Sequence, residues 1–492
     1  MRHPMQNMNI SRRSFLGGAF SFAALGFGRA FAVEPGSFST GRPNLRVGVL
    51  SDIHVSHLPG TKGVKPFTHS SGECFLRVLE LYRDLKVDAV LIAGDLTNYG
   101  DLCELQAVAD IWKRVFPENR LPDGARVEPL VVYGNHDAIG FKFMHKKDYE
   151  GDAAKRAAML ELSIFKDPGA AYANAFGEPW APVWSKTVKG YTFVGAHWGH
   201  EDEAPAFIRA HREELKGGKP FFYFQHPHPA NTVYGTFAWG RDRGKTTEAL
   251  AEFPNAVAFS GHSHYTLTDP HTIWQGAFTS VGTATLSHSG IPCYGMRVEN
   301  HKSTLKSKEG NRMALVSRGR QGMVMEVYDD RIVLSRREYP ADVAVGPDWV
   351  IPFAEKERPF RYDEQAKRMK APEFPDGAKA TARRVKGKLV KKDGAKESEA
   401  QIVVRFDGAV AREDPGRVFF YDVTGSVDGK KVKTRRVLAD GYWHAASKLG
   451  DKGACVFPAS DFPEDQPVEF SVRPLDAFLN AGRPITCTLK AS

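Results

Sequence analysis

Short apolar runs alternate with segments of helical spacing over the first two thirds of the chain. The runs are almost continuously apolar, as in strands buried on both faces, and they cover residues 45–50, 89–93, 129–133, 193–196, 221–224 and 256–259. Apolar positions recur with helical spacing over residues 74–85 and 102–115, between the first three runs. This alternation predicts an α/β fold. Residues 138–185 lack it, and we expect them to form an irregular insertion at the rim of a cleft.

The pattern changes in the last third of the chain. Residues 351–375 are rich in proline and charge, which is typical of a linker. Short strand-like runs separated by Gly, Asp and Pro turns then follow at residues 378–389, 400–406, 417–423, 431–438, 454–457, 467–472 and 485–489. Such spacing predicts a β-sandwich. We therefore expect an α/β domain over residues 40–355 and an all-β, immunoglobulin-like sandwich over residues 370–492.

The N-terminal segment, residues 1–32, has the layout of a removable export signal. Arg12 and Arg13 precede a short apolar run, and Ala30-Phe31-Ala32 supplies a cleavage site with small residues. The paired arginines are typical of a twin-arginine signal. The apolar run is shorter than the roughly 20 residues needed to span a bilayer. We expect a periplasmic or otherwise extracytoplasmic protein with no transmembrane segment.

Composition and charge narrow the class of protein. The chain has 492 residues, and its mean hydropathy of -0.37 excludes a polytopic membrane protein. The formal charge of +9 includes the four arginines of residues 1–32, a segment that holds no acidic residue. The excess carried by the rest of the chain is too small to indicate nucleic-acid binding.

The five cysteines form no C-x-x-C pair, which argues against a zinc ribbon or a thioredoxin motif. Cys455 and Cys487 fall in strand-like runs near the C-terminus. A disulfide between them and two buried thiols are equally compatible with this pattern.

Polar clusters follow five of the predicted strands directly. They are Ser51-Asp52-Ile53-His54, Gly94-Asp95, Gly134-Asn135-His136-Asp137, Gln225-His226-Pro227-His228 and Gly261-His262-Ser263-His264. Open α/β sheets place their ligand sites at the carboxyl ends of strands. Carboxylate oxygen and imidazole nitrogen together suit zinc, manganese or iron. The sequence therefore predicts a metal site at this edge.

The order of these clusters resembles the pattern of the calcineurin-like metallophosphoesterase superfamily: D-x-H, G-D, G-N-H-D, H and G-H-x-H, over roughly residues 45–286. The resemblance implies a four-layer α-β-β-α sandwich with two divalent metal ions, which are manganese, iron or zinc. It assigns one ion to Asp52, His54, Asp95 and His264, and the other to Asp95, Asn135, His226 and His262. Asp95 would bridge the two ions, and His228 is the competing choice for His226.

The same resemblance implies a metal-dependent phosphoric ester hydrolase, a phosphodiesterase or phosphatase. A hydroxide bound by both metals would attack the phosphate ester, and His136, oriented by Asp137, would assist the leaving group. The residue three positions after Asp95 is Asn98, where purple acid phosphatases carry a tyrosine. The Asp95-Leu96-Thr97 sequence looks like the branch that contains cyclic-nucleotide phosphodiesterases.

Two other functions share parts of this pattern. An exported 5′-nucleotidase or nucleotide-sugar hydrolase would use the same metal ligands, but it needs a nucleoside-stacking domain that the sequence does not identify. A non-catalytic surface protein stabilised by metals would need no free histidine beside two ions. We therefore expect a phosphate ester as the substrate and leave the partner of the C-terminal domain open.

Overall fold

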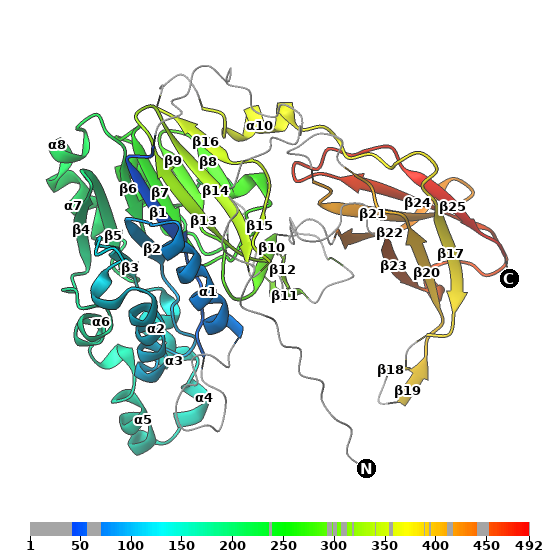
Figure 1. The fold of residues 1–492 in the computed structure, drawn as a ribbon. Coiled ribbons are helices and arrows are strands. Elements are labelled where there is room, and N and C mark those ends of the chain that lie inside the picture. Colours follow the sequence, from blue (N-terminus) through cyan, green and yellow to red (C-terminus); the bar gives the residue numbers. More distant parts are fainter. Residues whose placement is uncertain are drawn as a thin grey trace, which may run out of the picture.

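The structure is a computed structural model. It describes residues 42–56, 70–235, 239–292, 298, 303–306, 312–316, 319–339, 341–353, 358–387, 389–392, 395–410, 417–439 and 452–491. The predicted export signal, residues 1–32, lies outside these ranges. Two mixed sheets form the first part of the molecule, and antiparallel sheets form the C-terminal part (Figure 1). Among the described helices, none combines the length and the apolar character that a bilayer crossing requires.

The first sheet has the strand order β15-β14-β13-β1-β2-β3, with β16 paired to β14. Its strands are β1 (Leu45–Leu50), β2 (Ala89–Ala93), β3 (Glu128–Val132), β13 (Arg320–Val327), β14 (Arg331–Tyr339), β15 (Val343–Ala344) and β16 (Trp349–Pro352). Strands β1, β2 and β3 are parallel, whereas β13 joins β1 antiparallel with Leu45 opposite Val327. Every residue of β2 is buried, as its continuous apolar run predicted.

The second sheet has the order β4-β5-β6-β7-β9-β8. Its strands are β4 (Val183–Val188), β5 (Tyr191–Ala196), β6 (Phe221–Phe224), β7 (Ala256–Ser260), β8 (Ile273–Gln275) and β9 (Thr279–Gly282). Strands β5, β6, β7 and β9 are parallel, and β4 and β8 are antiparallel edge strands. The α/β prediction for this part of the chain is therefore confirmed.

The two sheets share one apolar core. Val47 and Leu91 of the first sheet pack in one cluster with Phe222, Phe224 and Val281 of the second sheet. Helices α1 (Ser70–Asp84), α2 (Leu102–Val115) and α6 (Pro168–Phe176) cover the other face of the first sheet. Helices α7 (Ala204–Ala210) and α9 (Lys245–Leu250) cover the second sheet, and α8 (Arg212–Leu215) follows α7. Because β1, β2 and β3 run parallel in the first sheet, and β5, β6, β7 and β9 run parallel in the second, each set of strands places its carboxyl ends at one edge of its sheet.

The segment expected to be irregular, residues 138–185, is largely helical, so that prediction is wrong. Besides α6 it holds most of α3 (Asn135–Phe143), α4 (Lys146–Tyr149), α5 (Ala153–Leu160) and the 3-10 turn η2 (Ile164–Lys166). The capping signals were present in the sequence. At the start of α5, Asp152 accepts a hydrogen bond from Lys155 N. At the start of α6, Asp167 accepts a hydrogen bond from Ala170 N, and Pro168 is the first residue of the helix.

Smaller elements complete this part of the molecule. A sheet of the order β10-β12-β11 contains β10 (Ser289–Pro292), β11 (Ser303–Lys306) and β12 (Arg312–Val316), and 3-10 turns lie at η1 (Pro117–Asn119) and η4 (Pro270–Thr272). The predicted linker, residues 351–375, contains part of β16 and helix α10 (Tyr362–Arg368). The hydroxyl group of Tyr362 donates to His271 O at 2.6 Å. This segment is therefore partly folded onto the α/β part.

The C-terminal part is rich in β-strands, as predicted. One sheet joins β17 (Ala380–Val385), β20 (Gln401–Phe406) and β23 (Gly453–Pro458), and the other joins β22 (Lys430–Leu438), β21 (Phe420–Val427), β24 (Val468–Leu475) and β25 (Ile485–Leu489). A hairpin of β18 (Leu389–Lys392) and β19 (Ala395–Ser398) and the turn η5 (Ala459–Asp461) complete it. The two sheets share an apolar core that includes Val404 and Phe470. The immunoglobulin-like topology stays a prediction. Cys487 is a free cysteine, so it forms no disulfide with Cys455.

The two parts of the molecule contact each other through apolar side chains. Ile291 and Val298 pack in one buried cluster with Phe419, Phe420, Leu438, Leu475 and Ala477 of the C-terminal part. The ring of Phe478 lies 4.3 Å from the ring of His271. The C-terminal part therefore covers apolar surface of the α/β part.

A chain that ends at Met369 is expected to be less stable than the full chain, because it uncovers Ile291 and Val298. Exposing one side chain of this size lowers the free energy of unfolding by about 1.5–3 kcal/mol. For the two side chains together we expect a Tm lower by about 5–10 °C. Thermal unfolding and light scattering measure the effect. A soluble, monomeric truncation with the Tm of the full chain would contradict the prediction.

Candidate metal centre

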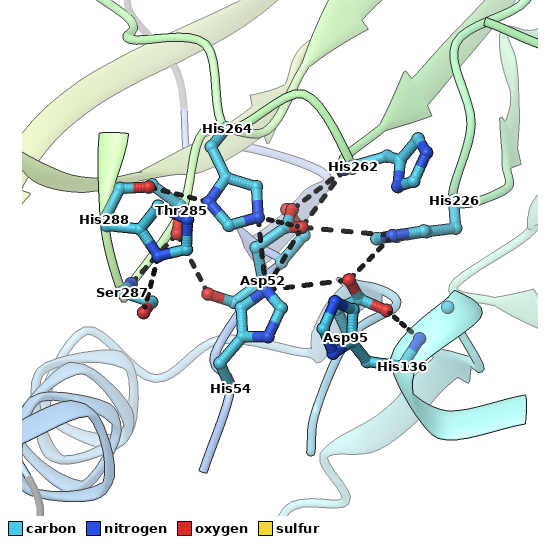
Figure 2. Close-up of polar contacts among 12 residues, drawn as sticks. Asp52, His54, Asp95, His136, His226, His262, His264, Thr285, Ser287 and His288 are labelled. Atoms are coloured by element: carbon cyan, nitrogen blue, oxygen red, sulfur yellow. Dashed lines mark hydrogen bonds and ion pairs between the residues drawn. The ribbon is translucent and has the colours of Figure 1, made fainter. Parts of the chain in front are cut away.

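Seven candidate ligands lie at the carboxyl ends of strands from both sheets. Asp52 and His54 follow β1, Asp95 follows β2, Asn135 begins α3 after β3, His226 follows β6, and His262 and His264 follow β7. Figure 2 shows the rings of His54 and His264 on one side of the centre and those of His226 and His262 on the other. The carboxylates of Asp52 and Asp95 lie between them. The structure thus brings together clusters that are more than 200 residues apart in the chain.

The first group consists of Asp52, His54, Asp95 and His264, all buried. Each offers one ligand atom, and these atoms lie within 4.8 Å of one another. Nε2 of His264 is 3.0 Å from Oδ1 of Asp52, and Nε2 of His54 is 3.6 Å from Oδ2 of Asp95. The two Nε2 atoms are 3.1 Å apart. Carboxylate oxygens and imidazole nitrogens therefore converge on one point.

The second group consists of Asp95, His226 and His262. Nε2 of His226 lies 3.1 Å from Oδ2 of Asp95, and the rings of His226 and His262 are 4.8 Å apart. Asp95 belongs to both groups. A single buried carboxylate thus faces both sets of ligand atoms, as the bridging assignment requires.

Backbone carbonyl groups set the tautomers of the histidines. Nδ1 of His226 contacts Ala93 O at 2.7 Å, and Nδ1 of His264 contacts His288 O at 2.6 Å. Because a carbonyl oxygen only accepts hydrogen bonds, each Nδ1 must carry the proton. Nε2 of each neutral ring then presents a lone pair to the centre, which is the arrangement that metal-binding histidines use.

The carboxylates and histidines of the centre shift each other's protonation. Burial raises the pKa of Asp95, but His226, His136 and His54 together lower it well below its usual range. Burial lowers the pKa of His226, but Asp95 and Asp52 raise it above the ordinary value. The centre therefore keeps the negative charge on Asp95 and attracts positive charge. The same negative charge attracts divalent cations, and their binding releases protons from such histidines.

The donor set fits metal ions. Oδ1 of Asn135 is buried and has no hydrogen-bond partner within the described part of the chain, whereas the buried Nε2 of His226 faces Oδ2 of Asp95 at 3.1 Å. Asn135 stands between Gly134 and His136, and the backbone N–H of His136 donates to Oδ1 of Asp95 at 2.9 Å. A buried polar atom without a partner costs about 1–3 kcal/mol. A cation held by these atoms would remove that cost, so the residues suit a two-metal centre.

The backbone at the ligands is strained. Left-handed φ angles occur at Asp52 (52°), His54 (50°), Asp95 (53°), His262 (69°) and His264 (57°). Each such residue costs about 1–2 kcal/mol relative to right-handed geometry. Strain of this kind gathers at functional sites. Glycine is required at position 134 for a steric reason, because a Cβ atom there would lie 2.1 Å from Oδ1 of Asp95.

His136 is oriented by a backbone carbonyl group, not by Asp137. Nδ1 of His136 contacts Asn98 O at 2.6 Å. The carboxylate of Asp137 accepts hydrogen bonds from Gly134 N at 2.9 Å and from Thr97 N at 2.8 Å. The prediction that Asp137 orients His136 is therefore wrong. Asp137 instead ties the turn after β2 to the start of α3, and burial together with the Asp95 charge raises its pKa to about 6.

The competing histidine, His228, lies outside the two groups of ligand atoms. Its Nδ1 contacts Oγ of Ser260 at 2.7 Å and its Nε2 contacts Oγ of Ser263 at 2.6 Å. Burial lowers the pKa of His228 to about 3, and its ring stacks on Tyr265. With both ring nitrogens occupied, His228 has a packing role, whereas His226 faces Asp95.

Sequence reasoning missed the residues that support the ligands. The ring of His288 lies 4.3 Å from that of His264, and its carbonyl oxygen accepts from His264. Ser51 donates to the Asp52 carboxylate, and Thr283 donates to Ser51 Oγ at 2.6 Å. Ser51 and Thr283 each follow a strand directly, but only the strand before Ser51 was predicted from the sequence. His288 and Thr283 follow no motif, and a carbonyl oxygen has no signature in a sequence.

One family model matches the part of the chain that holds this centre. Residues 45–266 match the family described as calcineurin-like phosphoesterase, a span that contains all seven candidate ligands and His136. Among curated proteins, no sequence matches the chain. Similar solved structures include a dimetal phosphatase from Danio rerio, with 10% identity, 63% of this chain and 100% of that chain covered and a TM-score of 0.35. A purple acid phosphatase from yellow lupin has 12% identity, 63% and 55% coverage and a TM-score of 0.35. The Vacuolar Protein Sorting 29 structure from Cryptosporidium parvum has 10% identity, 62% and 97% coverage and a TM-score of 0.27.

Proposed function

We propose, on the premise that residues 45–266 form a calcineurin-like phosphoesterase domain, that the protein hydrolyses a phosphodiester or phosphomonoester with the help of two divalent metal ions. The observation that carries the proposal is the position of Asp95, whose buried carboxylate faces both groups of ligand atoms. The first ion would be held by Asp52, His54, Asp95 and His264. The second would be held by Asp95, Asn135, His226 and His262.

When bound, two such ions polarise the phosphate and make a water molecule more acidic. The protein's own residues then supply position and proton transfer. His136 holds one proton on Nδ1 against Asn98 O, and its ring lies 4.6 Å from the ring of His54. In the imidazolium form, the second proton sits on Nε2, at the opposite side of the ring. This arrangement of protons supports a role for His136 in protonating the leaving oxygen.

Metal-reconstituted protein tests this function. The full chain is stripped with a chelator, reloaded with manganese, iron(II) or zinc, and assayed with p-nitrophenyl phosphate and bis(p-nitrophenyl) phosphate beside elemental analysis. We expect turnover that requires metal, with two ions per chain. A protein that holds two ions and cleaves neither ester would instead support the metal-stabilised binding protein, and a strong preference for 5′-nucleotides would support the nucleotidase.

Export is a further part of the proposal, supported by the sequence of residues 1–32 alone. Replacing both Arg12 and Arg13 by lysine keeps the charge but removes the paired guanidinium groups of the signal. We expect precursor to accumulate in the cytoplasm, folded and active. Cell fractionation measures the distribution, and an unchanged periplasmic fraction would exclude the twin-arginine route.

A further inference from the structure

Two exposed aromatic side chains border the metal centre. Among the exposed large hydrophobic side chains of the described residues, the aromatic ones are Phe143, 42% exposed, and Trp239, 37% exposed. Each contacts a histidine of the centre. The ring of Phe143 lies edge-on to that of His136 with centroids 5.0 Å apart, and Trp239 stacks on His262 at 4.5 Å. Leaving aromatic surface in water is unfavourable, and exposed apolar surface beside a site commonly marks a binding surface.

The backbone at Trp239 is anchored to a buried side chain. Its N–H donates to the hydroxyl group of Tyr265 at 3.0 Å, and Tyr265 is itself 3% exposed. Trp198 extends the aromatic surface, because its ring lies 5.2 Å from His262 and 6.0 Å from His226. The exposed indole is therefore a fixed surface next to the second group of ligand atoms.

The position of these rings relates them to the substrate. A phosphate group held at the centre would direct its organic groups toward the rim, where Phe143 borders His136 and Trp239 borders His262. Planar aromatic groups stack on such rings in a way that aliphatic groups do not. Stacking of a base on an aromatic side chain strengthens binding by about 5- to 100-fold.

We propose that Trp239, with Phe143, determines substrate specificity by stacking on a planar aromatic group of the phosphate ester. This inference rests on the proposed function, since it concerns the organic part of the same substrate. Trp239 is a binding residue in this proposal. The competing interpretation is that Trp239 only holds the His262 ring in place, and the experiment must separate the two.

Phosphonates separate binding of the organic group from chemistry, because they carry the phosphate-like charge but are not hydrolysed. Isothermal titration of the metal-loaded full chain compares phenylphosphonate with methylphosphonate. We expect wild-type protein to bind phenylphosphonate about 5- to 100-fold more tightly. Trp239→Ala should lose most of this preference while its affinity for methylphosphonate and its metal content stay unchanged, and Trp239→Phe should retain part of the preference.

Val456→Ala is the matched control, because Val456 is also 37% exposed but lies on β23 of the C-terminal part. It should keep the full preference. Equal affinity of the wild type for both phosphonates would overturn the inference. So would an equal loss for both ligands in Trp239→Ala with loss of metal, which would assign the indole to holding His262. The proposed function fails by a different result: a metal-loaded protein that binds neither phosphonate nor inorganic phosphate and hydrolyses no ester.

Discussion

Asp95→Asn should leave the protein with fewer than two metal ions and with turnover reduced by more than 100-fold. Removing a residue that only orients a metal ligand already lowers metal affinity or activity by about 10–100-fold. Asp95 faces both groups of ligand atoms itself. Two dications about 4 Å apart repel each other by roughly 17 kcal/mol at an effective dielectric of 20. The asparagine side chain keeps the size of Asp95 but removes the negative charge that offsets this repulsion. Elemental analysis and turnover at saturating added metal measure the result.

Two variants serve as controls for Asp95→Asn. Asn135→Ala removes one neutral ligand from one ion, so we expect lower affinity at that site and partial rescue by excess metal. Asp476→Asn removes the charge of another fully buried carboxylate, which accepts from Phe478 N at 2.8 Å in the C-terminal part. It should change stability but not metal content. Two ions and near-normal turnover in Asp95→Asn would show that Asp95 is not the bridging ligand.

The candidate ligands were predictable because each follows a buried strand directly. The run that precedes Asp95 is apolar without interruption, and the run that precedes Asp52 contains one charged residue, Arg46. Parallel strands place the residues at their carboxyl ends along one edge of a sheet. Knowing the strand ends is then enough to bring distant residues together. Asp52 and His262, which are 210 positions apart, are joined by a hydrogen bond from His262 N at 3.2 Å.

Other parts of the fold depend on contacts between distant residues that no local sequence pattern predicts. Strand β13 completes the first sheet beside β1, yet Leu45 and its partner Val327 are separated by most of the α/β part. The α3–α6 segment was misjudged because short helices with their own caps lack a long apolar repeat. At the centre, the orientation of His136 comes from the carbonyl group of Asn98, and any residue in position 98 would offer one.

His136→Ala should keep both metal ions but lower turnover by about 10²–10⁴, the usual contribution of general acid–base catalysis. Its side chain is in neither group of ligand atoms, and only its backbone N–H contacts Asp95. If His136 protonates the leaving oxygen, the loss should be large for esters of poorly acidic alcohols and small for p-nitrophenyl esters, whose leaving group needs little protonation. Turnover across a series of leaving groups measures this dependence.

Added imidazole sharpens the His136 test, because it can diffuse into the space left by the ring. We expect it to restore part of the turnover of His136→Ala on poor leaving groups and to leave the wild type unchanged. His200→Ala is the matched control, since the His200 side chain is 31% exposed and contacts Glu203 at 2.7 Å; it should behave as wild type in every assay. An equal loss across all leaving groups would assign His136 to binding the phosphate charge instead, because electrostatic stabilisation of the phosphate does not depend on the acidity of the departing alcohol.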